Sequence, residues 1–133
     1  MSLAMLNAGG PDFDVDAFLQ SHPGVPCSSV WHRGEVGRRG RVNDESGFCA
    51  EVVEFEDRDE LVEAVGRFLE PRSRFFADLA AHGASSRIHI GLYVGSEKSF
   101  APSILFPPAV LQLLAERSVH LVVSGYPVSD PED

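Results

Sequence analysis

The sequence predicts a single α+β domain in which a mostly antiparallel sheet is covered by helices on one face. Stretches that alternate apolar and polar residues, typical of strands, are interleaved with stretches of helical spacing in the order β-α-β-β-α-β-α-β. Two of the strands follow one another directly, as in a hairpin, which favours antiparallel pairing. The 133 residues show no internal repeat or linker, so we expect one domain over 1–133.

The N-terminal part predicts a short strand followed by a helix. After a short extension, the strand is expected at about 3–7 and should end at the sequence Gly9-Gly10-Pro11. Asp12 or Asp14 can then cap a helix, because a side-chain oxygen accepts the free amides of the first turn. This helix should end where proline and glycine follow one another, at 21–24.

A hairpin is expected next, with strands over 28–35 and 48–55 and a long connection rich in glycine and arginine. Strict alternation puts Phe48 on one side of the second strand and Phe55 on the other.

The strongest helical pattern begins at Asp57, which fits a capping box with the glutamate three residues later. Phe68 and Leu69 lie on the apolar side of this helix and are expected to be buried under the sheet. Pro71 should interrupt the helix, because proline lacks the amide and clashes with the preceding turn. The helical pattern then resumes and should stop at Gly83.

The C-terminal part predicts a strand over 87–95, a polar loop up to 102, and a helix that opens at Pro107-Pro108. The last strand is expected over 119–124. A frayed acidic tail should follow from about 127.

The charge balance limits the class of partner. Eleven Lys and Arg stand against 20 Asp and Glu, which gives a net charge of −9. Such a chain repels nucleic acid and anionic membranes, so we expect it to bind neither. No apolar run approaches the roughly 20 residues of a membrane helix, and the N-terminus lacks the basic region of a secretory signal. We therefore expect a cytoplasmic protein.

The two cysteines are too few for a disulfide scaffold and are expected to be free thiols. His22, Cys27, His32 and Cys49 carry the atoms that zinc prefers, but no pair has the spacing of a zinc motif. We expect no metal and no cofactor.

Four short motifs carry a family resemblance: Gly24-Val25-Pro26, Trp31-His32-Arg33-Gly34-Glu35, Gly40-Arg41-Val42 and Ser46-Gly47-Phe48. With them, the chain resembles the bacterial domain-of-unknown-function family 4279 (DUF4279) over about residues 12–126. Phe48 departs from the pattern, which commonly has a tryptophan there. The resemblance implies an open α+β fold. That family has no established activity, so the resemblance implies no catalytic residues.

Two groups of residues are candidates for a binding site. Trp31, Arg33 and Glu35 alternate along one predicted strand, where an aromatic ring, a guanidinium and a carboxylate could hold a ligand. A surface Arg33–Glu35 pair beside a half-buried tryptophan is the alternative. The nearby arginines, Arg33, Arg38, Arg39 and Arg41, would supply any anion contacts, or would only solvate the loop.

The second group is formed by His89 and His120, each opposite the apolar residues of its own strand. If these strands pair, both histidines and Tyr93 face away from the helices, where they could form a ligand or proton-transfer site. Solvated or partner-covered histidines are the alternative. No nucleophile motif or phosphate-binding loop accompanies either group.

Three functions follow from these features. The first is a protein-binding module, such as one of the inhibitor or immunity type, because an acidic chain can be steered onto a basic target. The open sheet face would be covered by that partner or by a second copy in a homodimer. The second is a small-molecule or anion-binding domain that uses the Trp31 strand and the arginines. An enzyme that uses His89 or His120 ranks last.

Overall fold

The computed structural model describes residues 2–55, 57–94 and 103–127, and it confirms the predicted α+β class and the order of the elements. The sheet strands are β1 (Ser2–Gly10), β2 (Cys27–Trp31), β3 (Ser46–Phe55), β4 (Ser85–Val94) and β5 (Val119–Pro127). The α-helices are α1 (Val15–Ser21), α2 (Arg58–Leu69), α3 (Ser73–Ala81) and α4 (Pro108–Glu116). Two short 3-10 helices, η1 (Arg38–Gly40) and η2 (Glu70–Arg72), complete the elements.

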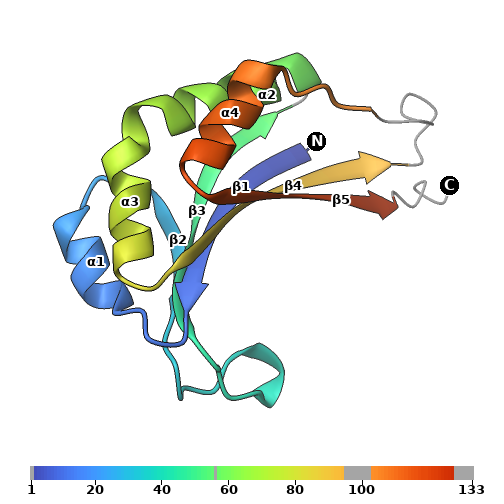
Figure 1. The fold of residues 1–133 in the computed structure, drawn as a ribbon. Helices are drawn as coiled ribbons and strands as arrows, with labels where there is room; N and C mark the ends of the chain where they lie inside the picture. Colours follow the sequence, from blue (N-terminus) through green and yellow to red (C-terminus); the bar gives the residue numbers. More distant parts are fainter. Residues whose placement is uncertain (1, 56, 95–102, 128–133) are drawn as a thin grey trace, which may run out of the picture.

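The five strands form one sheet in the order β2-β3-β1-β4-β5. Three neighbouring pairs are antiparallel, and β4 and β5 run parallel. The α-helices lie together on one side of the sheet (Figure 1). We call this side the covered face, and the opposite side, which carries none of the described helices, the open face.

Strand β1 is longer than predicted and continues through Gly9 and Gly10. Gly10 belongs there because the chain approaches its α-carbon closely: a Cβ atom on it would lie 2.1 Å from the carbonyl oxygen of Gly83. A glycine is therefore needed at this position because the backbone near Gly83 packs against it, and it does not end the strand. Asp14 caps α1 as predicted, since its side chain accepts the amide of Ala17 at 3.1 Å.

The hairpin differs from the prediction in two ways. β2 ends at Trp31 instead of continuing to Glu35, because Gly34 takes a left-handed conformation (φ +88°) that turns the chain. In β3 the register shifts opposite Ala4 and Met5, which is a β-bulge. The bulge moves Phe55 to the covered face, where it is buried, although strict alternation puts it opposite Phe48.

The long helical region breaks where Pro71 predicts, with η2 between α2 and α3. Asp57 caps α2 through the amide of Asp59, at 2.8 Å. Gly83, at φ +82°, follows α3 as the expected stop. The prediction for Phe68 was wrong, since it is only half-buried where it packs against the margin of the core, whereas Leu69 is fully buried.

The core lies between the covered face and the helices. Its largest fully buried side chains come from α1, α2, α3, β1, β3 and β4, among them Phe18, Phe48, Leu6 and Phe76. On β4 and β5 the apolar side chains of Ile88 and Val119 face this core as predicted. The expected loop over 95–102 and most of the expected tail, 128–133, lie outside the described residues. No described helix is long and apolar enough to cross a membrane.

Candidate functional site

The open face of the sheet carries a trough made of two adjoining hollows. The first, of about 260 Å³, is lined by Trp31, Glu45, Arg87 and β1 residues 7–9, and the second, of about 270 Å³, by Leu3, Met5, Cys49, Gly91 and Tyr126. Asn7 and His89 line both hollows and join them. These residues, which we call the open-face trough, stand opposite the buried side chains of the same strands.

The first end of the trough is built on two glycines. Gly9 of β1 and Gly47 of β3 are direct partners across the sheet. A Cβ atom on Gly47 would lie 2.6 Å from the Trp31 ring, and one on Gly9 would lie 2.9 Å from a carboxylate oxygen of Glu45. The missing side chains therefore leave the space that the indole and the carboxylate occupy.

Tyr126 forms the other end of the trough. A Cβ atom on Gly91 of β4 would lie 3.1 Å from its ring, so this aromatic ring also leans inward from an edge strand over a glycine. Met5 and Cys49 are half-buried in the floor between the two ends. Burial raises the pKa of the Cys49 thiol above its ordinary value, because the thiolate would lose solvation.

Polar side chains occupy the middle of the trough. His89 Nε2 and Ser124 Oγ form a hydrogen bond of 2.7 Å between β4 and β5. Arg87 lies in register with Asn7 on one side and His120 on the other. No ion pair to Arg87 exists among the described residues.

The structure places His89 and His120 on the open face, as the sequence predicts, but it does not bring them together. β4 and β5 pair in parallel with His89 opposite Val122 and His120 opposite Arg87. His89 lines the trough, whereas His120 is exposed and lines neither hollow. The side chain of Tyr93 lies outside the described part of the structure.

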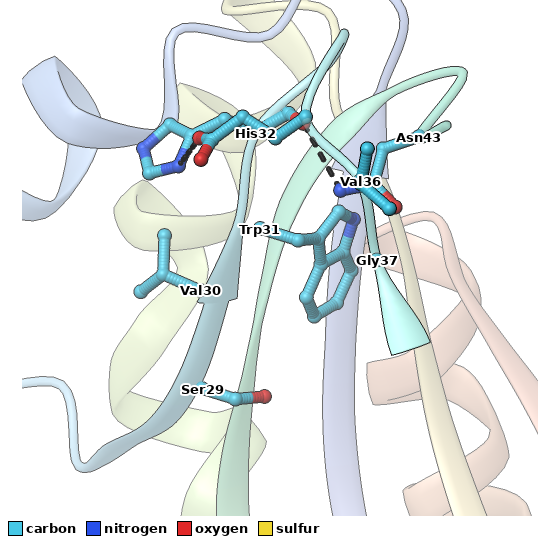
Figure 2. A pocket seen from close by; sticks show the side chains of 8 residues that line it. Ser29, Val30, Trp31, His32, Val36, Gly37 and Asn43 are labelled. Atoms are coloured by element: carbon cyan, nitrogen blue, oxygen red, sulfur yellow. Dashed lines mark hydrogen bonds and ion pairs between the residues drawn. The ribbon is translucent and has the colours of Figure 1, made fainter. Parts of the chain in front are cut away.

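Arg33 and Glu35 do not alternate with Trp31 along a strand, because β2 ends before them, although Glu35 lines a hollow of about 540 Å³ together with Trp31. Figure 2 shows the indole of Trp31 and the imidazole of His32 pointing to opposite sides of the chain, with the imidazole paired with a carboxylate on the side away from the indole. Glu35 Oε1 lies 2.7 Å from His32 Nδ1, and Arg33 instead reaches the carbonyl of Pro11 at 3.1 Å. Neither the ligand-binding trio nor the Arg33–Glu35 pair is present.

His32 links the hairpin to α1. Its Nε2 atom lies 3.0 Å from both carboxylate oxygens of Asp16, while Nδ1 faces Glu35. The hydrogen bond with Asp16 raises the pKa of His32 above its usual 6.5, and Glu35 raises it further. The two nitrogens point in opposite directions, so the carboxylates clamp the ring rather than converge on one point.

The arginines of the connection do not form an anion site around Trp31. A third hollow, of about 540 Å³, lies beside Trp31 and includes His32, Val36 and Asn43 (Figure 2), but no arginine lines it. Arg39 and Arg41 are exposed, and the side chain of Arg38 lies outside the described residues. The arginine that does line a hollow with Trp31 is Arg87.

The residues that sequence reasoning missed are Glu45, Arg87, Met5, Tyr126 and Ser124. The sequence could have indicated Arg87, because it lies two residues before His89 on a clearly alternating strand, so that both side chains are on the same face. No comparable signal existed for Glu45, which precedes β3 and reaches the trough only because Gly9 leaves room. Within the described ranges, no three His, Cys, Asp or Glu side chains converge as metal ligands.

The His89–Ser124 hydrogen bond joins an imidazole and a hydroxyl in the middle of the trough. The trough offers an indole, a carboxylate, a guanidinium and an amide to a ligand. No protein-family model, curated protein or solved structure matches this chain.

Proposed function

We propose that the chain is a protein-binding module whose open-face trough receives a basic partner protein. The observation that carries the proposal is the composition of the trough. Trp31, Arg87 and Tyr126 are of the residue types that dominate binding hot spots, and methionine, as at Met5, is also enriched at interfaces. The trough is shallow and lies on a sheet face that none of the described helices covers.

The charge of the chain favours a basic partner. Glu51 and Glu54 are exposed on the open face, in register with Met5 and Leu3 of the trough. Together with the net charge of −9, they attract a positively charged surface and raise its association rate. An inhibitor or immunity-type protein that neutralises a basic target would have this character.

A bacterial origin and a location in the cytoplasm are part of this proposal. The resemblance to DUF4279 would make the chain a bacterial protein, and its free thiols, Cys27 and Cys49, suit the cytoplasm. The proposal assigns no reaction to the chain.

A small-molecule or anion-binding domain is the second candidate, and Arg87 is the observation that favours it. Its guanidinium has no ion pair among the described residues and lines a hollow with Trp31 and His89. A small aromatic anion would use all three groups. Titration with such anions and quenching of Trp31 fluorescence would test this alternative directly.

Affinity capture with matched variants tests the proposed function. Met5→Arg places a bulky cation on the floor of the trough, while Leu111→Arg makes the same change on exposed α4, on the other side of the sheet. We expect the wild type and Leu111→Arg to recover the same partner from an extract of the source organism. We expect Met5→Arg to recover at least about tenfold less, because the cation blocks the trough and repels a basic surface.

Equal recovery by both variants would remove the trough from binding. Light scattering separates a foreign partner from a second copy of the chain. We expect a mass near the 14.5 kDa of one copy, because two copies of charge −9 repel one another. A doubled mass that Met5→Arg returns to one copy would instead assign the trough to a homodimer.

A further inference from the structure

We infer that the Trp31 end of the open-face trough is a cation subsite that takes an arginine side chain of the partner protein. This inference rests on the proposed function and names the group that anchors the partner. It is carried by the adjacent indole of Trp31 and carboxylate of Glu45, which line one hollow.

The two groups are held side by side by the paired glycines beneath them. Gly47, under the indole, and Gly9, under the carboxylate, are direct register partners on β3 and β1. Neighbouring strands lie about 5 Å apart, so a group resting on Gly9 is adjacent to one resting on Gly47. Trp31 lines both this hollow and the hollow of about 540 Å³ beside the trough, so its ring is accessible.

The carboxylate of Glu45 has no counterion among the described residues. It is half-buried, and no hydrogen bond or ion pair to it exists in that part of the chain. Other acidic side chains in the hairpin region, such as Glu35 and Asp12, do have partners at 2.7 and 3.6 Å. Glu45 is therefore available to an incoming cation.

A guanidinium fits this pair better than an ammonium. Its planar fork can donate two charge-assisted hydrogen bonds to one carboxylate while its face stacks on an aromatic ring. A cation over an indole face is also attracted by the ring electrons. A surface that combines both groups recognises arginine by shape as well as by charge.

Arg87 sets the direction of the bound side chain. It lines the same hollow as Glu45 but forms no ion pair with it, so the hollow is negative at the Trp31 end and positive toward His89. An incoming guanidinium is repelled by Arg87 and is confined to Glu45 and Trp31. Removing the charge of Arg87 should therefore tighten cation binding, whereas removing that of Glu45 should weaken it.

NMR titration tests the subsite without knowledge of the partner, because Trp31 is the single tryptophan of the chain and gives one indole signal. The probes are N-acetyl-arginine amide and its neutral isostere N-acetyl-citrulline amide, in low salt. We expect the arginine probe to shift the Trp31 signal with a Kd of about 1–10 mM, and the citrulline probe to bind at least about fivefold more weakly.

Variants of matched charge locate the effect. Glu45→Gln should weaken binding of the arginine probe about fivefold or more, while Glu60→Gln, a change at an exposed glutamate of α2, should leave it within about twofold. Arg87→Gln should bind the probe more tightly than the wild type. Melting temperatures of the three variants confirm that they are folded.

Equal binding of the two probes, no shift of the Trp31 signal, or unchanged binding by Glu45→Gln would overturn the subsite. The proposed function is judged separately. If Met5→Arg still abolishes capture of the partner, the trough binds a protein without an arginine anchor. If Met5→Arg captures normally, the proposed function itself fails.

Discussion

The two faces of the sheet differ although the same strands build them. On β1, Ala4 and Leu6 point to the covered face and are fully buried, whereas Leu3 and Met5 point to the open face and are half-buried. On the covered face the neighbours are helices, so apolar side chains meet apolar side chains. On the open face the neighbours among the described residues are the rings of Trp31 and Tyr126 from the edge strands, polar groups and solvent.

This difference separates stability from binding. Burial of apolar area stabilises a fold by about 25 cal/mol per Å², so the covered face determines whether the chain folds. Half-buried residues contribute less to folding, and they retain area that a partner can still remove from water. The open face can therefore carry Trp31, Arg87 and Tyr126 at little cost to the stability of the domain.

The largest expected effect is a contrast between alanine substitutions on the two faces. Phe48 is fully buried on the covered face and stacks on Phe18, with 5.8 Å between the ring centroids. The substitution Phe48→Ala should therefore lower the free energy of unfolding by about 3–5 kcal/mol. Met5→Ala on the open face should cost about 1 kcal/mol. Urea unfolding of both variants measures the difference. Equal losses of unfolding free energy would contradict the division between the faces.

The covered face could be predicted from the sequence because its signals are periodic. The alternation of β4 and the helical spacing of α2 each repeat one rule several times, so the buried positions Ile88, Ile90, Leu61 and Leu69 follow directly. Phe68 was misassigned because it lies at the margin of the apolar stripe. Its ring is instead covered by the Arg72 guanidinium, 4.3 Å from the ring centroid.

The open-face trough could be predicted only in part. His89 follows from alternation, but Trp31 and Glu45 depend on where β2 ends and on the pairing of Gly9 with Gly47. Both depend on tertiary register, and a bulge opposite Met5 shows how one extra residue reverses the faces of a strand. No local pattern in the sequence records these features.

A glycine substitution tests how tightly the Trp31 end is built. In Gly47→Ala the new Cβ would lie 2.5 Å from the carbonyl oxygen of Ala8 and 2.6 Å from the Trp31 ring, so the ring must move. We expect a loss of about 1–3 kcal/mol in unfolding free energy and a red shift of the Trp31 fluorescence. Gly24→Ala is the matched control, because nothing lies within 4 Å of its Cβ position. A Gly47→Ala protein with unchanged stability and emission would show that the indole does not rest on this glycine.

The two cysteines compare the floor of the trough with the edge strand of the sheet. Cys49 is half-buried on β3, where burial raises the pKa of its thiol, whereas Cys27 is exposed on the edge strand β2. Since the thiolate is the reactive form, we expect Cys27 to react with iodoacetamide at neutral pH at least about tenfold faster than Cys49. Mass spectrometry of the timed reaction assigns each site, and Cys27→Ser should retain only the slow phase. Equal rates would mean that the floor of the trough is as accessible as the exposed edge strand β2.

The smallest effect concerns His32, which joins the hairpin to α1 on the side opposite Trp31 (Figure 2). The hydrogen bond with Asp16 and then the charge of Glu35 raise the pKa of His32 above 6.5, so the folded chain binds a proton more tightly than the unfolded chain. The resulting stabilisation is fully present below pH 6.5, while both carboxylates are ionised, and is lost as the pH rises through the raised pKa.

Thermal unfolding of wild type and His32→Gln across pH 5.5–8.5 measures this contribution. We expect the wild type to melt slightly higher at the acidic end and the two curves to converge at the alkaline end, since an exposed ion pair contributes little. His120→Gln, an exposed histidine with no hydrogen bond or ion pair among the described residues, should show no such convergence. A wild-type advantage that grows with rising pH would reverse the sign and exclude the Asp16–His32–Glu35 clamp as the source. Addition of salt should reduce the acidic advantage, because the clamp is open to solvent and its charges are screened.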